Sequence, residues 1–186
     1  MGITEILKKY SKAGNNKVFV YCFETPVGKM IASADDDFLY MVMFEDSKNI
    51  EKTFHIRAMQ LSCYFLEEKN KLLNQFENEV KDYFEGKLHR FSIPIKTFGS
   101  EFQKDVWDKL LEIPFGSTHT YGSLAKMMGR PASHSRAVGA ACGANAHLLV
   151  VPCHRLVASN SNGGFSCGLD RKEWLLKHEK KFSSLK

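Results

Sequence analysis

The alternation of apolar and polar residues near the N-terminus predicts three short β-strands. Apolar-rich runs occupy residues 18–25, 29–34 and 38–44, separated by a Pro-Val-Gly sequence and by three consecutive aspartates. Proline, glycine and aspartate favour turns between strands. We therefore expect an antiparallel meander, in which each strand pairs with the next along the chain.

Apolar residues then recur at helical intervals between residues 70 and 85, and Gly86 can end this helix. The next stretch predicts extended chain, because Pro94 disfavours helical backbone at the residue before it. We place a domain boundary there. Residues 1–96 are expected to form an N-terminal α/β supporting domain, and residues 97–186 a second domain.

The second domain is predicted to be mainly helical, which makes the fold class α+β. An apolar stripe with a spacing of four residues begins at Phe102, and its helix ends before Pro114. Two shorter helices follow at 123–128 and 134–144, joined by a Gly-Arg-Pro turn. Their spacing fits a DNA-binding helix-turn-helix and equally an ordinary helical hairpin.

The last of these helices carries the small-residue sequence SRAVGAACGAN, in which Arg136 is the one long side chain. Such a surface offers few side chains to base edges in the major groove. It can approach a DNA backbone and the narrower minor groove, or it can pack closely against a neighbouring helix. The residues alone leave both interpretations open.

The distribution of charge adds weight to a nucleic-acid partner. Residues 1–100 contain 14 basic and 14 acidic side chains, so the whole net charge of +5 comes from residues 101–186. A basic excess on one domain is typical of proteins that bind polyanions. An apolar content of 44% supports ordinary cores, and no apolar run is long enough to cross a membrane, so we expect no membrane partner.

The chain has five cysteines, an odd number at irregular spacing and without a C-x-x-C pair. This pattern, together with an N-terminus that lacks an apolar signal core, predicts reduced thiols inside a cell. The scattered residues Cys22, His55, Cys63 and His89 lack the spacing of zinc ligands. We therefore expect neither a metal nor another cofactor.

One cysteine, Cys153, is followed directly by the pair His154-Arg155. A reactive cysteine needs a base to remove its proton and a group that orients the base, usually a carboxylate. Sequence neighbours do not face each other in a helix or a strand, so His154 would need a bridging water or a turn. Glu173 and Glu179 are the candidate carboxylates, and an unreactive buried thiol is the alternative.

Several motifs of the second domain resemble one known family in register. They are FQKDVWDKLLEIPFGSTHTYGSLA, SRAVGAACGAN, VPCHRL and SCGLDRKEWLLKHE, which together span residues 102–179. This combination resembles the O6-alkylguanine-DNA alkyltransferases, also called methylated-DNA–protein-cysteine methyltransferases. The first hundred residues are similar only loosely, in YFEGKLHRFSIPI and the early strands.

The resemblance implies an RNase H-like antiparallel sheet with helices in the N-terminal domain and a helix-turn-helix in the second. It implies a monomer inside the cell, in the nucleus of a eukaryote or the cytoplasm of a prokaryote. Double-stranded DNA carrying O6-alkylguanine would bind through its minor groove, and the damaged base would rotate out of the duplex. The alkyl group would then pass irreversibly to the protein, which acts once.

The resemblance also implies roles for individual residues. Cys153 is the nucleophile, and His154 is its base through a water. Glu179 orients His154, while Asn145 holds the turn that carries the cysteine. Tyr121 donates a proton or a hydrogen bond to the departing guanine, where negative charge develops.

Substrate contacts are implied in the same way. Ser166 would donate to O6, and the backbone carbonyl groups of Cys153 and Leu156 would accept from the guanine amino group. Phe165 would line the alkyl pocket. Cys167 stands where many members have glycine, so it would narrow the rim of the pocket.

On the DNA side, Arg136 would insert into the base stack and replace the flipped nucleotide, with Ser135, Ala137 and Gly139 beside it. Alkyltransferase-like proteins share the helix-turn-helix but bind lesions without repairing them, and they commonly carry Trp at the cysteine position. Cys153 argues against that class. A thiol hydrolase that turns over repeatedly is the remaining alternative.

Overall fold

The computed structural model describes residues 2–12 and 14–184, and its contacts divide the chain into two compact units. The first unit takes in the described residues up to Lys81 together with Ser92–Lys96. The second takes in Asp82–Phe91 and the described residues from Thr97 onward. Residues 82–91, which precede the boundary drawn from the sequence, thus pack within the second unit.

The first unit is built on a four-stranded sheet with the strand order β3-β2-β1-β4. β1 (Asn16–Phe23), β2 (Met30–Ala34) and β3 (Leu39–Phe44) pair antiparallel with their chain neighbours, as the sequence predicts. β4 (Cys63–Leu66) has no counterpart among the predicted strands, and it pairs parallel with the start of β1. The sheet is therefore mixed, which corrects the expectation of a purely antiparallel one.

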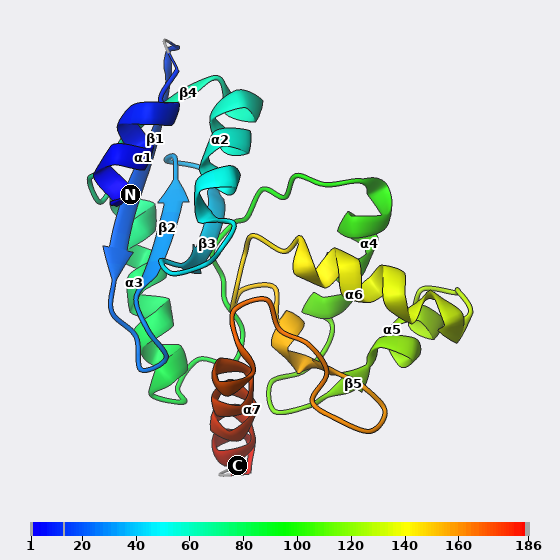
Figure 1. Cartoon of the computed structure of the whole chain (residues 1–186). Coiled ribbons are helices and arrows are strands. Elements are labelled where there is room, and N and C mark those ends of the chain that lie inside the picture. The colour runs from blue at the N-terminus through cyan, green and yellow to red at the C-terminus, as the bar shows by residue number, and fades with distance from the viewer. Residues whose placement is uncertain (1, 13, 185–186) are drawn as a thin grey trace. The chain divides into compact units, whose positions relative to one another are not determined.

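Helices cover both faces of this sheet. Figure 1 shows α1 (Ile3–Tyr10) and α2 (Ile50–Leu61) in front of the strands and α3 (Lys71–Phe84) behind them. Every residue of β2 and β3 is buried as a result. The bounds of α3 are close to those that its periodicity predicts. Gly86 follows it with a φ of +72°, a left-handed conformation that glycine adopts without strain.

The second unit is mainly helical. Its elements are α4 (Glu101–Leu111), β5 (His119–Thr120), α5 (Tyr121–Met127), the 3-10 turn η1 (Ala132–His134), α6 (Ser135–Gly143), the 3-10 turn η2 (Cys153–Arg155), β6 (Leu156–Val157) and α7 (Leu169–Ser183). α4 begins at a capping box, in which the side chains of Ser100 and Gln103 bond to each other's backbone N–H groups. It ends before Pro114, as predicted.

The core of this unit holds the two short helices in place. Trp107 of α4 is buried and donates its indole N–H to the carbonyl oxygen of Ala141 in α6 at 3.0 Å. The connection between α5 and α6 passes through Gly129, whose φ is +70°. α5 and α6 contact each other as the two helices of the predicted helix-turn-helix. No helix of the described residues is long and apolar enough to span a membrane.

Candidate active site around Cys153

Cys153 begins the turn η2, and only 5% of the residue is exposed. The side-chain amide of Asn145 donates to its Sγ at 3.2 Å and to the carbonyl oxygen of Val151 at 2.9 Å. The amide oxygen of Asn145 accepts the backbone N–H of His147 at 2.8 Å. One buried amide therefore fixes both the turn that follows α6 and the sulfur at its end.

Glu179 of α7 accepts five hydrogen bonds although it is almost fully buried. Its Oε1 accepts from His154 Nε2 at 2.7 Å, from the Tyr83 hydroxyl at 2.9 Å and from Arg155 Nη2 at 3.1 Å. Its Oε2 accepts from Arg155 Nε at 2.9 Å and from the backbone N–H of Gly116 at 3.0 Å. Burial alone would raise the pKa of Glu179, but His154 and Arg155 more than offset it and hold that pKa well below its usual range.

Of the two carboxylates that the sequence offered, the structure brings Glu179 to His154. Glu173 lies earlier on α7, with an exposed side chain that pairs with Lys177 at 2.7 Å. The helix decides between them, because six residues place the two carboxylates on different faces.

The anionic Glu179 fixes the state of His154. A carboxylate only accepts, so His154 carries its proton on Nε2 and a lone pair on Nδ1. Burial lowers the pKa of His154, against the opposing effect of the Glu179 hydrogen bond. The imidazole is therefore neutral at pH 7 and available as a base.

The sulfur is also neutral at rest. Burial raises the pKa of Cys153 to about 11, although the Asn145 hydrogen bond and the charge of Lys172 act in the opposite direction. At neutral pH the thiol thus keeps its proton. Chemistry at this sulfur requires that the proton pass to a base as the reaction proceeds. The next residue along the chain is His154, whose imidazole is neutral.

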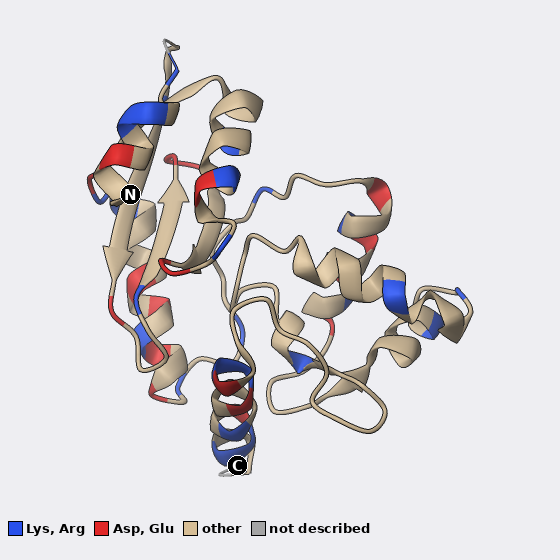
Figure 2. Cartoon of the chain, in the orientation of Figure 1, with Lys and Arg blue, Asp and Glu red and all other residues tan. Residues whose placement is uncertain are grey.

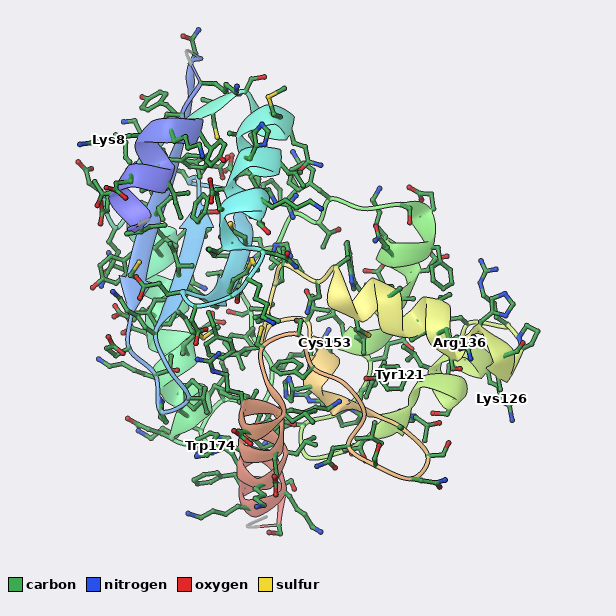
Figure 3. All side chains as sticks on the ribbon, viewed as in Figure 1. Lys8, Tyr121, Lys126, Arg136, Cys153 and Trp174 are labelled. Carbon is green, nitrogen blue, oxygen red and sulfur yellow. The ribbon has the colours of Figure 1, made fainter. Side chains whose placement is uncertain are left out.

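Cys153 lies in the wall of a pocket of about 520 Å³, a size typical of small-molecule sites. Seven of the predicted site residues line it: Tyr121, Ser135, Arg136, Gly139, Cys153, Phe165 and Ser166. Cys142 of α6, which has no predicted role, is also in the wall. Figure 3 labels Cys153, Tyr121 and Arg136, which come from three different elements of the unit.

Six other predicted residues do not line the pocket: Asn145, His154 and Glu179, described above, and Leu156, Cys167 and Ala137. Leu156 is fully buried, and its backbone carbonyl already accepts a hydrogen bond from Lys172 Nζ. Cys167 lies next to a wall residue, with its sulfur 3.7 Å from the Ser166 hydroxyl oxygen. Ala137 is exposed on α6.

Tyr121 is the first residue of α5 and is half-buried, and its hydroxyl donates to the carbonyl oxygen of Gly164 at 3.2 Å. Burial raises the pKa of its phenol, with smaller effects from Cys142 and Cys153. Gly163 has a φ of +70°, and a Cβ there would lie 2.9 Å from the tyrosine ring. The glycine-rich loop before α7 is thus shaped to accommodate this ring.

Basic side chains lie on the exposed part of α5, α6 and their connection. Lys126, Arg130 and Arg136 are all exposed. Figure 2 shows basic positions in blue on α6 and on its connection to α5, and Figure 3 labels Lys126 and Arg136 there. Arg136 is in the first turn of α6 and also lines the pocket. This surface is suited to an anionic partner that reaches into the pocket.

Sequence reasoning missed three contributors to the site. Arg155 forms two hydrogen bonds to Glu179 and a third to the carbonyl oxygen of Ile113 at 2.6 Å. Tyr83 and Lys172 are fully buried polar side chains, and each donates to a site residue. Only Arg155 had a local signal, since it adjoins the cysteine; the others depend on contacts far apart in the chain.

A metal has no evident place among the described residues. No group of three or more His, Cys, Asp or Glu side chains there is arranged to hold an ion. The five cysteines are free thiols in the structure.

Two family descriptions match the chain. Residues 18–97 match the ribonuclease-like domain of 6-O-methylguanine DNA methyltransferase, and residues 101–181 match its DNA-binding domain. A methylated-DNA–protein-cysteine methyltransferase of Methanosarcina acetivorans is 37% identical over 84% of this chain and 95% of its own length. The inducible enzyme of the same name from Bacillus subtilis is 39% identical over 74% of this chain and 77% of its length.

Solved structures show the same likeness. Mycobacterium tuberculosis OGT, crystallised in complex with DNA, superposes with a TM-score of 0.77 at 27% identity, over 88% of this chain and 94% of that one. A crystal structure of O6-methylguanine methyltransferase from the same organism gives a TM-score of 0.75 at 27% identity, over 88% of this chain and 93% of that one. The chain therefore belongs to the methylated-DNA–protein-cysteine methyltransferase family.

Proposed function

We propose that the protein repairs O6-alkylguanine in double-stranded DNA by transferring the alkyl group irreversibly to Cys153. The observation that carries this proposal is a cysteine in the wall of the pocket, with His154 bonded to Glu179 at 2.7 Å directly after it in the chain. The names of the relatives describe the same transfer to a protein cysteine.

The reaction forms one bond and breaks one. The proton of Cys153 passes to Nδ1 of His154 through a water, and the sulfur attacks the alkyl carbon on O6. The C–O6 bond breaks, and its electron pair remains on the guanine, which leaves as an anion. Tyr121 gives up its bond to Gly164 and donates to this anion, while Glu179 stabilises the imidazolium that has formed.

The product explains why the protein would act once. A thioether at Cys153 has a poor leaving group, so a second base cannot displace the alkyl group. Loss of the lesion from excess duplex should therefore stop at one repaired base per protein molecule. Continued loss beyond that ratio would support the thiol hydrolase instead.

DNA is proposed to bind along α6 through the minor groove. Ser135, Ala137 and Gly139 are small residues of that helix, and Arg136 in its first turn lines the pocket together with Ser135 and Gly139. In this position Arg136 can fill the space that the flipped nucleotide leaves in the stack. The monomeric state and the intracellular location remain predictions of the same kind.

Arg136→Ala should slow repair of lesion duplex by about ten- to a hundredfold, since unstacking a base costs a few kcal/mol and the arginine no longer compensates. The measurement is single-turnover transfer from an O6-methylguanine duplex. The free base O6-benzylguanine needs no flipping, so its reaction with the variant should keep the parent rate. An equal loss with both substrates would contradict the role, because it would indicate a damaged pocket.

Cys167→Gly should widen the rim of the pocket and speed reaction with O6-benzylguanine more than with O6-methylguanine. Its sulfur is 3.7 Å from the hydroxyl of Ser166, which lines the pocket. The ratio of the two rate constants is the measurement, with Cys22→Ala in the first unit as a matched cysteine control. The same ratio in all three proteins would rule out a restriction at Cys167.

The alternative is a lesion-binding protein without transferase activity. The pocket and the basic surface fit that function equally well, but a binding protein has no use for a cysteine held by Asn145 beside a neutral histidine. Cys153 and its neighbours therefore favour transfer.

A further inference from the structure

Lys172 is a fully buried ammonium group in the second unit. Its Nζ donates to the backbone carbonyl oxygen of Leu156 and to that of Gly164, the latter at 2.9 Å. Among the described residues no carboxylate forms a hydrogen bond or ion pair with it. Buried lysines are rare and are normally paired with an acid, so a buried cation that bonds to carbonyl groups in place of a carboxylate requires another source of negative charge.

The charged and titratable groups that face Lys172 are those of the pocket. α5 contributes Tyr121, whose ring centroid is 5.8 Å from Nζ, and α6 contributes Cys142. η2 contributes Cys153 and His154. Burial lowers the pKa of Lys172, and the two thiols are the groups whose charge raises it. Lys172 bonds to Gly164, which lines the same pocket as Cys142 and Cys153, so a thiolate formed in that pocket is a negative charge that can compensate this ammonium group.

The alkyl-transfer chemistry proposed above creates that charge. When the proton of Cys153 leaves for His154, a negative sulfur forms in a buried site, where an isolated thiolate is unstable. Glu179 lies against the imidazolium and compensates the positive partner. The sulfur itself receives hydrogen bonds from neutral groups, among them the Asn145 amide at 3.2 Å.

We infer that Lys172 is a positioning residue that supplies the countercharge for the Cys153 thiolate. Through its bond to Gly164 it also holds the glycine-rich loop before α7 in place. The inference rests on the proposed function for the step that it serves. Gly164 accepts from both Lys172 and Tyr121, so its carbonyl oxygen stays bonded when Tyr121 turns to the departing base. After transfer the thioether is neutral, and the countercharge is no longer used.

The test separates charge from hydrogen bonding with three substitutions in the full chain. Lys172→Gln keeps an amide that can donate to the carbonyl groups but has no charge. Lys172→Met removes both, and Lys172→Arg keeps the charge. The probe is iodoacetamide without DNA, which bonds to the Cys153 sulfur and releases iodide, and the rate is followed on the Cys153 peptide by mass spectrometry between pH 7 and 9.

If Lys172 supplies the countercharge, the Gln and Met variants both react about tenfold more slowly than the parent at each pH, which corresponds to a rise of one unit in the pKa of Cys153. The Arg variant stays near the parent. Thermal melts establish that each variant is folded at the assay temperature. If arginine does not fit the buried site and the Arg variant is unfolded, the Gln and Met variants alone test the countercharge.

If the Gln variant reacts like the parent and only the Met variant is slower, the countercharge role is overturned. Lys172 would then act only through its hydrogen bonds to the carbonyl groups. Equal rates in all four proteins would overturn both parts. Iodoacetamide needs no guanine, so the outcome is independent of the proposed function. A parent that labels normally but leaves lesion duplex alkylated would contradict that function alone.

Discussion

Cys153→Ser should abolish repair of O6-methylguanine duplex while the protein stays folded and binds DNA. Serine is nearly isosteric and can still accept the Asn145 hydrogen bond that holds the sulfur at 3.2 Å. Its hydroxyl is far less acidic than a thiol, and a single neutral histidine cannot make it an effective nucleophile toward an alkyl carbon. Transfer, measured as loss of lesion over hours with excess protein, should be undetectable.

DNA binding by the Cys153→Ser variant should be kept although alkyl transfer is lost. Arg136 and the surface of α6 are unchanged in the variant, so the dissociation constant for lesion duplex should stay within a few-fold of the parent. Cys142→Ser, which alters the other thiol of the pocket wall, is the matched control and should retain transfer. Residual transfer in Cys153→Ser would contradict the assignment of Cys153 as the nucleophile. Loss of transfer in Cys142→Ser alone would contradict it as well.

His154→Gln should cost about 10²- to 10⁴-fold in transfer rate at pH 7, the usual contribution of a general base. The glutamine amide can still donate to Glu179, which keeps its two bonds from Arg155, so the buried carboxylate remains satisfied. What the variant lacks is a lone pair that can receive the proton of Cys153.

The pH dependence gives the same prediction a second form. In the parent the histidine is neutral, because its pKa is lowered below 6.5, and the thiol is neutral up to a pKa of about 11. The reactive pair therefore exists across pH 7 to 9, and the rate should be nearly flat there, falling only in acid as His154 gains a proton. In His154→Gln the thiolate must form by loss of the proton to solvent.

The variant's rate should therefore rise about tenfold per pH unit over the same range, since the thiolate fraction rises by that factor below its pKa. Single-turnover transfer at several pH values distinguishes the two profiles. His55→Gln in the first unit is the control and should follow the parent. A flat profile in His154→Gln would mean that another group takes the proton.

The sequence predicts the fold well where periodicity is local. The three antiparallel strands and α3 follow from runs of apolar residues and the turn residues between them. β4 is only four residues long, and its pairing with β1 joins segments more than forty residues apart, which no local pattern reveals. α2 buries only Phe54, Arg57 and Ala58. This apolar stripe is too weak to predict a helix from the sequence.

The site divides in the same way. Cys153 and His154 are adjacent in sequence, and Asn145 lies eight residues before the cysteine, so a short motif can indicate their chemistry. The residues alone left Glu173 and Glu179 as candidates, the family resemblance indicated Glu179, and the fold brings Glu179 to His154. The charge state of Cys153 depends on burial by the whole unit, and the neutral thiol found here could not be read from the His-Arg pair that follows it.

Lys172 shows the limit most clearly. In the sequence it is one of several basic residues in DRKEWLLKHE, and nothing there separates it from its exposed neighbours. Only the packing of α7 against β6 and the glycine-rich loop before α7 removes it from water and bonds its Nζ to the carbonyl oxygens of Leu156 and Gly164.

The most direct test of alkyl transfer to Cys153 is the mass of the intact protein after incubation with an O6-methylguanine oligonucleotide duplex. We expect a gain of one methylene group per molecule, located by fragmentation on the peptide that contains Cys153, with normal guanine left in the DNA. Lesion-bearing duplex that is recovered fully methylated from excess protein, or protein of unchanged mass beside repaired DNA, would contradict it.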